Sequence, residues 1–192
     1  MSNPFRRLRQ KAKSRKSALS VIALLCALGF VIIIADIPGR LKEFQLLRDG
    51  KADVHTAYQS EERSINEQLL ALLGAKSQYN SAYCEHSGGT ETREKGYCME
   101  IISYDASMNL TQADASNIIS DFDKFFFNLG WGATDIPNLT RHVDGKVTIN
   151  YLGYTKRYPH DVTCWVNGSL GVGLPQSNAA YYCSKELDLG KR

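Results

Sequence analysis

Residues 110–130, LTQADASNIISDFDKFFFNLG, contain the clearest helix of this sequence, and this helix determines the expected fold class. Thr111 is placed to cap the helix, and Asp114 stands in the first turn, where a negative charge is favoured. Gly130 is a typical residue for the end of a helix. One face of the helix is apolar and rich in aromatic residues, so it has to pack on another element. The members of this face are Ala115, Ile118, Ile119, Phe122, Phe125, Phe126 and Leu129.

The segments around this helix have the alternation that is typical of β-strands, so we expect an antiparallel sheet as its packing partner. The expected strands cover residues 97–104, 139–143, 146–151, 161–167 and 179–185. Asp144-Gly145 predicts a two-residue hairpin turn. The glycine-rich segment 168–173 fits neither of the nucleotide-binding glycine patterns, and we expect it to be a turn between strands. The predicted fold class is therefore α+β.

Four of the five cysteines follow the apolar N-terminal segment, and their even number indicates two disulfides. Of the three connectivities, Cys84–Cys98 with Cys164–Cys183 is favoured because each pair closes a short local loop. No C-x-x-C pair occurs, which argues against a zinc site and against a thioredoxin-type redox centre.

The N-terminal part of the chain has the pattern of a membrane signal-anchor. Residues 18–35, ALSVIALLCALGFVIIIA, contain no charged residue. At about 1.5 Å per residue such a helix is long enough to match a hydrocarbon core of ~30 Å. The first sixteen residues hold seven of the 23 basic residues and no acid, so the N-terminus is expected to be cytoplasmic.

Three alternatives to a permanent anchor remain open. One of them, a buried helix of a soluble domain, is disfavoured by the seven basic residues directly before the span. Cleavage as a signal peptide would need a shorter apolar core and small residues at the cut, whereas here the exit reads Ile33-Ile34-Ala35-Asp36. Lipid attachment at Cys26 is disfavoured because Leu24-Leu25 lacks the small residue that this processing prefers.

These features divide the chain into four expected parts. They are a basic cytoplasmic tail at 1–16, a transmembrane signal-anchor helix at 17–36, a juxtamembrane helical stalk at 37–78 and an extracytoplasmic α+β domain at 79–192. Within the stalk, Asp49-Gly50 is expected to separate a short helix from a longer amphipathic helix at 52–73. Glu61 interrupts the apolar stripe of the longer helix. This helix either packs on the domain or pairs as a coiled coil, and packing is favoured because three heptads with a charged break are few for pairing.

No catalytic arrangement is visible in the sequence. The histidines are not spaced to share a helical face, and the chain has neither G-x-S-x-G nor H-E-x-x-H. We therefore disfavour an enzyme and expect no metal and no cofactor. Outside the tail the chain has 16 basic residues against 20 acids, so nucleic acid is not an expected partner either.

Aromatic residues cluster in the C-terminal half of the chain. If Val162, Cys164 and Val166 face the core, Trp165 faces the opposite side of the sheet. Exposed aromatic residues are common where proteins bind other proteins or glycans, although loops or the stalk helix could cover this side. The candidate binding residues are Trp131, Tyr154, Tyr158, Trp165 and Tyr182.

The leading functional hypothesis is a non-enzymatic module that is anchored in the cell membrane and presents a disulfide-stabilised domain to a protein or glycan partner. Self-association is a further option. The alternative is a filament or envelope-assembly subunit, because an apolar N-terminal helix followed by a small head with a C-terminal disulfide loop resembles a pilin in outline. The pilin-type processing signal does not follow the basic tail, since Gly29-Phe30 lies within the span and the next acid is Asp36. An envelope enzyme is the third hypothesis.

Overall fold

The structure is a computed structural model of the 192-residue chain. It describes residues 4–74, 76–87, 94–134, 140–143, 147–173 and 176–190. Within these ranges, the side chains of 4–37, 76–78, 140–143 and 147 are not described. The chain divides into two units, Met1–Gln45 and Leu46–Arg192, and each is treated by itself below.

The first unit is helical from Pro4 onward. Its helix is the first part of α1 (Pro4–Leu73). The predicted tail at 1–16 and the predicted span at 17–36 fall in the stretch whose side chains are not described. In the part of the chain that the structure describes fully, no helix is long and apolar enough to cross a membrane.

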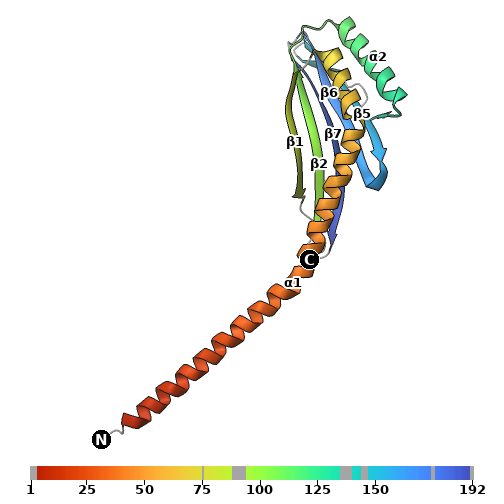
Figure 1. Ribbon diagram of the computed structural model, residues 1–192. Coiled ribbons are helices and arrows are strands. Elements are labelled where there is room, and N and C mark those ends of the chain that lie inside the picture. The colour runs from red at the N-terminus through yellow and green to blue at the C-terminus, as the bar shows by residue number, and fades with distance from the viewer. Residues whose placement is uncertain are drawn as a thin grey trace. The chain divides into compact units, whose positions relative to one another are not determined.

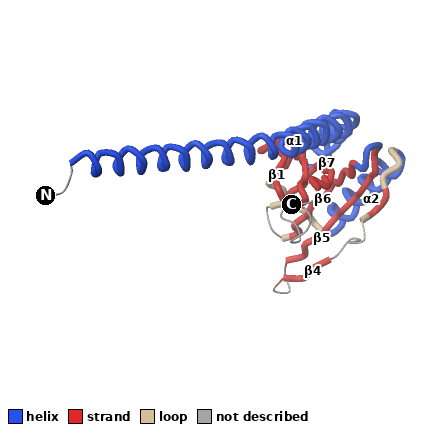
Figure 2. The backbone as a smooth tube through the Cα atoms, turned by 90° about the horizontal axis from the view of Figure 1, so that it is seen from below, coloured by secondary structure: helices blue, strands red, loops and turns tan. Residues whose placement is uncertain are grey.

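The second unit is an α+β domain in which α1 from Leu46 and α2 lie over one face of a sheet (Figures 1 and 2). Its other elements follow α1 in chain order. They are β1 (Lys76–His86), β2 (Glu94–Ala106), α2 (Gln112–Asn128), β3 (Gly132–Ala133), β4 (Thr140–Val143), β5 (Val147–Tyr158), the short 3-10 helix η1 (Pro159–Asp161), β6 (Val162–Val172) and β7 (Ser177–Gly190). The predicted α+β class is confirmed.

The described strands form one sheet in the order β1-β2-β7-β6-β5-β3, with β4 also paired to β5. All of these strand pairs are antiparallel, as predicted. The last strand, β7, lies between β2 and β6, so it joins the N-terminal hairpin to the C-terminal strands. Both predicted disulfides are present. Each links directly opposed residues of neighbouring strands, Cys84 with Cys98 across β1 and β2, and Cys164 with Cys183 across β6 and β7.

Helix α2 confirms the predicted helix and both of its ends. The Thr111 hydroxyl accepts a hydrogen bond from the backbone N–H of Asp114, and the Asp114 carboxylate accepts one from the backbone N–H of Thr111. Ala115, Phe122 and Phe126 are buried, and the rest of the predicted apolar face is partly buried against the core.

The break predicted at Asp49-Gly50 is wrong, because α1 continues through it to Leu73. Gly50 is buried, and a Cβ at this position would lie only 2.9 Å from Cδ2 of Leu187 and 3.3 Å from Sγ of Cys98. The glycine therefore permits a close approach of the helix to the sheet instead of ending the helix. Of the two alternatives for 52–73, the structure has this helix packed on the domain, with Tyr58, Ile65 and Leu69 fully buried.

The turn predicted at 168–173 is also wrong for most of its length, because β6 continues to Val172. Gly168 pairs with Leu152 on one side and Ala179 on the other. A Cβ at Gly168 would lie 2.8 Å from the backbone oxygen of Asn178, so this glycine serves close packing between strands. The hairpin turn predicted at Asp144-Gly145 lies outside the described residues.

Gly50→Val tests the close approach of α1 to the sheet. We expect it to lower the free energy of unfolding by about 1–3 kcal/mol, because the added side chain overpacks the contact with Leu187. Gly39→Val is the matched control in the same helix, since a Cβ at Gly39 meets nothing within 4 Å. Chemical unfolding of the purified full chain, followed by circular dichroism, measures both. Equal effects at the two positions would contradict the packing role of Gly50.

Candidate functional site

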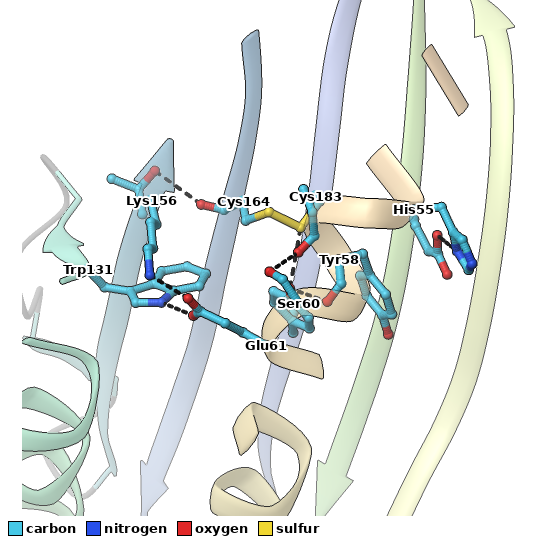
Figure 3. The surroundings of a disulfide bond; sticks show 12 residues. His55, Tyr58, Ser60, Glu61, Trp131, Lys156, Cys164 and Cys183 are labelled. Carbon is cyan, nitrogen blue, oxygen red and sulfur yellow. Dashed lines mark hydrogen bonds and ion pairs between the residues drawn. A yellow bond between two sulfur atoms is a disulfide. The ribbon is translucent and has the colours of Figure 1, made fainter. Parts of the chain in front are cut away.

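The helix-covered face of the sheet contains an ion pair between α1 and β5 (Figure 3). The Glu61 carboxylate accepts hydrogen bonds from the Lys156 ammonium and, at 2.6 Å, from the indole N–H of Trp131. Lys156 also donates to the backbone oxygen of Leu129 at 2.7 Å. The side chains of Lys156 and Glu61 are only 25% and 16% exposed, so each charge depends on the other for its stability. The acid that interrupts the apolar stripe of the sequence therefore holds the helix on the sheet.

Further polar contacts join α1 to β2 and β7. The donor and acceptor pairs are Lys185 Nζ with Asp53 Oδ2 at 2.7 Å, His55 Nδ1 with Glu100 Oε2 at 2.9 Å, Tyr104 Oη with Asn66 Oδ1 at 2.9 Å, and Tyr181 Oη with the backbone oxygen of Tyr58 at 2.8 Å. Burial raises the pKa of Tyr104 and Tyr181 well above the usual value, so both hydroxyls stay neutral and can donate. These groups position the helix.

Two of the predicted binding residues, Trp131 and Tyr154, lie in the core. Trp131 is 3% exposed and Tyr154 is 2% exposed. Both rings contact Phe126 of α2, at centroid distances of 5.4 Å and 4.4 Å. The Tyr154 hydroxyl donates to Asp123 of the same helix at 2.8 Å. The structure thus places these two residues on the helix-covered face, away from Trp165.

Tyr158 lies at a separate pocket of about 290 Å³ beside the connection between β5 and β6. The pocket is lined by Asp53, Thr56, Ala57, Ser60, Tyr158, Pro159 and His160. Two of its polar groups are engaged within the domain, since Asp53 pairs with Lys185 and the Ser60 hydroxyl donates to the backbone oxygen of Ala57. Tyr158 is therefore not brought together with Trp165 and Tyr182.

The opposite face of the sheet is covered by no helix in the part of the chain that the structure describes, and we call it the open face. Val162, Cys164 and Val166 are buried on the helix-covered face, which confirms the expected orientation of Trp165. Trp165 and Tyr182 occupy directly opposed positions on β6 and β7. Their rings are stacked, with centroids 5.2 Å apart and an interplanar angle of 20°.

This stacked pair belongs to a band of large side chains that crosses the open face, which we call the aromatic strip. Its members are Tyr83, Tyr97, Met99, Ile101, Trp165 and Tyr182. Ile101 is the β2 partner of Tyr182 in the sheet. Tyr83 and Tyr97 pack edge to face at 6.0 Å, and the Tyr83 hydroxyl contacts Sδ of Met99 at 3.5 Å. Every member is only partly buried, so the strip leaves apolar surface in contact with water.

An open concavity of about 610 Å³ lies on the same face, next to the strip. Its lining residues are Ser103, Tyr104, Asp105, Tyr151, Asn167, Gly168, Ser169, Asn178, Ala179 and Ala180. Ala180 precedes Tyr182 by two residues and therefore faces the same side of β7. The Asn167 amide donates a hydrogen bond to the Tyr182 hydroxyl at 2.8 Å, which links the concavity to the aromatic strip.

The described residues of the concavity carry little charge. Among the described residues that line the concavity, Asp105 is the one carboxylate, and none is a lysine, arginine or histidine. Burial raises the pKa of Tyr182, while the hydrogen bond from Asn167 acts in the opposite direction. The net shift is upward, so the Tyr182 hydroxyl stays protonated at neutral pH.

The sequence contained a weak signal for the concavity. It was missed because residues 168–173 were interpreted as a turn and not as part of a strand. Asn167 and Ser169 are two residues apart on β6, and Asn178 and Ala180 are two residues apart on β7, so each pair lies on one face of its strand. These small side chains, three polar and one an alanine, lie on one side of two neighbouring strands and leave a depression beside the larger rings. Finding it required the pairing of Ser169 with Asn178, which only the fold supplies.

Among the described residues, no group of three or more histidine, cysteine, aspartate or glutamate side chains could hold a metal ion. No protein-family model matches the chain, and no curated protein or solved structure matches it. What the protein does is therefore inferred from its own geometry.

Glu61→Ala tests the ion pair that positions α1. We expect a loss of about 2–4 kcal/mol in the free energy of unfolding, because Lys156 and the Trp131 indole lose their shared acceptor. Glu67→Ala on the same helix is the matched control. The side chain of Glu67 is 67% exposed, and among the described residues its carboxylate pairs only with Arg63, so its loss should cost about 0.5 kcal/mol or less. Urea unfolding of both variants, followed by tryptophan fluorescence, measures the two losses in the free energy of unfolding. Similar losses for Glu61→Ala and Glu67→Ala would contradict this role of Glu61.

Proposed function

We propose that this protein is a single-pass membrane protein whose extracytoplasmic domain binds a protein or glycan partner through the open face of its sheet. The uncharged run at 18–35 and the seven basic residues before it support the anchor and a cytoplasmic N-terminus. The two disulfides support an oxidising compartment for the domain.

The observation that carries the proposal is the stacked Trp165–Tyr182 pair on a face that no described helix covers. An antiparallel sheet can leave one face in water, and that face is then usually polar. Here the open face instead carries two large rings and the aliphatic Ile101 in one row across three strands. Large aromatic residues dominate the energy of many binding interfaces, so this row is the part of the surface that gains most from a partner.

Binding is favoured over catalysis by the contents of the concavity. Acid–base or nucleophilic chemistry usually needs two or more convergent groups with matched roles. In the part of the chain that the structure describes, the lining residues offer the single carboxylate of Asp105 and include no histidine, cysteine or lysine. Serine and asparagine side chains are suited to hydrogen bonding with a ligand.

Trp165→Ala and Tyr182→Ala test the binding role of the open face. In intact membranes, covalent crosslinking of the full chain should trap a partner, and each variant should reduce its yield at least about tenfold, because the apolar contact is lost. Phe127→Ala is the control, since Phe127 is a half-exposed aromatic residue on α2, which covers the other face. A partner yield that stays the same in both open-face variants would contradict the proposal.

A second candidate, an envelope-assembly subunit, is favoured by one observation on α1. Leu41 and Phe44 lie three residues apart on the helix and are 58% and 65% exposed. Apolar side chains at this spacing share one side of a helix, and a neighbouring helix or a lipid surface would shield them from water.

The intact mass of the protein purified from membranes distinguishes the two candidates. We expect the mass of the full chain, because a permanent signal-anchor is not processed. A mass that corresponds to cleavage after Gly29 would favour the assembly subunit, and it would contradict the permanent anchor.

A further inference from the structure

We infer that the partner of the open face is a neutral oligosaccharide, which lies in the concavity and packs against the Trp165–Tyr182 pair. This inference rests on the proposed function, and it narrows the choice between a protein and a glycan. It follows from the charge of the site, from its hydrogen-bonding groups and from the position of the rings.

The charges of the described lining residues favour a neutral ligand over an anionic one. Sites for phosphate, sulfate or carboxylate groups normally supply arginine, lysine or several backbone N–H groups. None of the described lining residues is basic, and Asp105 would repel an anion. Lys95, the cation of β2 on the open face, is paired with Glu186 of β7.

The hydrogen-bonding groups of the concavity match sugar hydroxyls, which both donate and accept. Asparagine offers a donor and an acceptor in one side chain, and serine offers both in one hydroxyl. The Asn178 carbonyl oxygen accepts from Ser169 at 3.0 Å, and this contact fixes the amide plane and directs its NH₂ group. Within the described part of the chain, the Ser103 hydroxyl and the Asp105 carboxylate have no hydrogen-bond or ion-pair partner, so both can bind a ligand.

The rings of Trp165 and Tyr182 provide the apolar contacts that a sugar ring needs. The C–H groups on one side of a pyranose ring form a flat apolar surface, which packs on an aromatic ring and leaves the hydroxyls at the edge. The hydrogen bond from Asn167 places Tyr182 next to the concavity, and Trp165 of β6 stacks on the Tyr182 ring. A sugar would pack on the ring surface that this stack leaves open. The volume of about 610 Å³ lies within the range of roughly 300–1,000 Å³ that is usual for small-ligand sites.

The test uses the full chain in detergent micelles and an array of oligosaccharides. The neutral probes are hexamers of cellulose, chitin, starch and xylan, and the acidic probes are oligogalacturonate and heparin-derived hexasaccharides. We expect binding to at least one neutral probe, with an affinity that changes less than about twofold between 0.05 and 0.5 M salt, because salt screens only charged contacts. Binding to the acidic probes alone, with a strong salt dependence, would overturn the inference.

A pair of variants on β7 tests the location of the sugar. Ala180→Leu fills the floor of the concavity and should weaken binding of the neutral probe at least about tenfold. Ser184→Leu adds the same side chain to the same face of the same strand, outside the residues that line the concavity, and should change binding less than about threefold. Thermal unfolding of both variants establishes that they are folded. Equal effects of the two variants on binding would overturn the inference.

The outcomes separate this inference from the proposed function. If crosslinking traps a protein partner that Trp165→Ala abolishes, while no neutral probe binds, the open face is a protein-binding surface and the sugar inference is wrong. If crosslinking traps no partner that depends on Trp165 and no neutral probe binds, both the inference and the proposed function are wrong.

Discussion

The position of α1 on the sheet depends on one carboxylate, Glu61, which lies on the apolar side of the helix and is only partly exposed. It accepts hydrogen bonds from Lys156 of β5 and from the indole of Trp131, which are 95 and 70 residues from Glu61 in the sequence. Because these charges are largely removed from water, the helix cannot slide along the sheet without leaving both unpaired. The rings of Phe126 in α2 and Tyr181 in β7 pack against Trp131, so both elements contact the residue that binds Glu61.

This arrangement has a direct consequence for function. Both helices of the domain lie on one face of the sheet, so the apolar side chains on the other face have no described element to cover them. The disulfide between Cys164 and Cys183 joins β6 and β7 from the helix-covered face, directly behind the strands that carry Trp165 and Tyr182. The covalent link holds the two strands in register, and it thereby holds the two rings in their stacked arrangement.

The sequence predicted the features that depend on local pattern. Thr111 and Asp114 defined the start of α2, loop length favoured the two disulfides, and alternation around Cys164 oriented Trp165. It did not predict features that depend on distant partners. Gly50 resembled a helix break until Leu187 was known to lie against it. Trp131 and Tyr154 resembled surface aromatics because nothing local indicates that Phe126 packs on both.

Hydroxyl-radical footprinting in native membranes is the most direct test that the open face binds a partner. Oxidation rates of Trp165 and Tyr182 are compared between the protein in its membranes and the same protein purified in micelles, with Phe127 as the internal reference. We expect that an occupied open face slows the oxidation of Trp165 and Tyr182 in membranes and leaves the rate at Phe127 unchanged. Equal rates for Trp165 and Tyr182 in the two preparations would contradict it, because an occupied open face shields both rings from solvent.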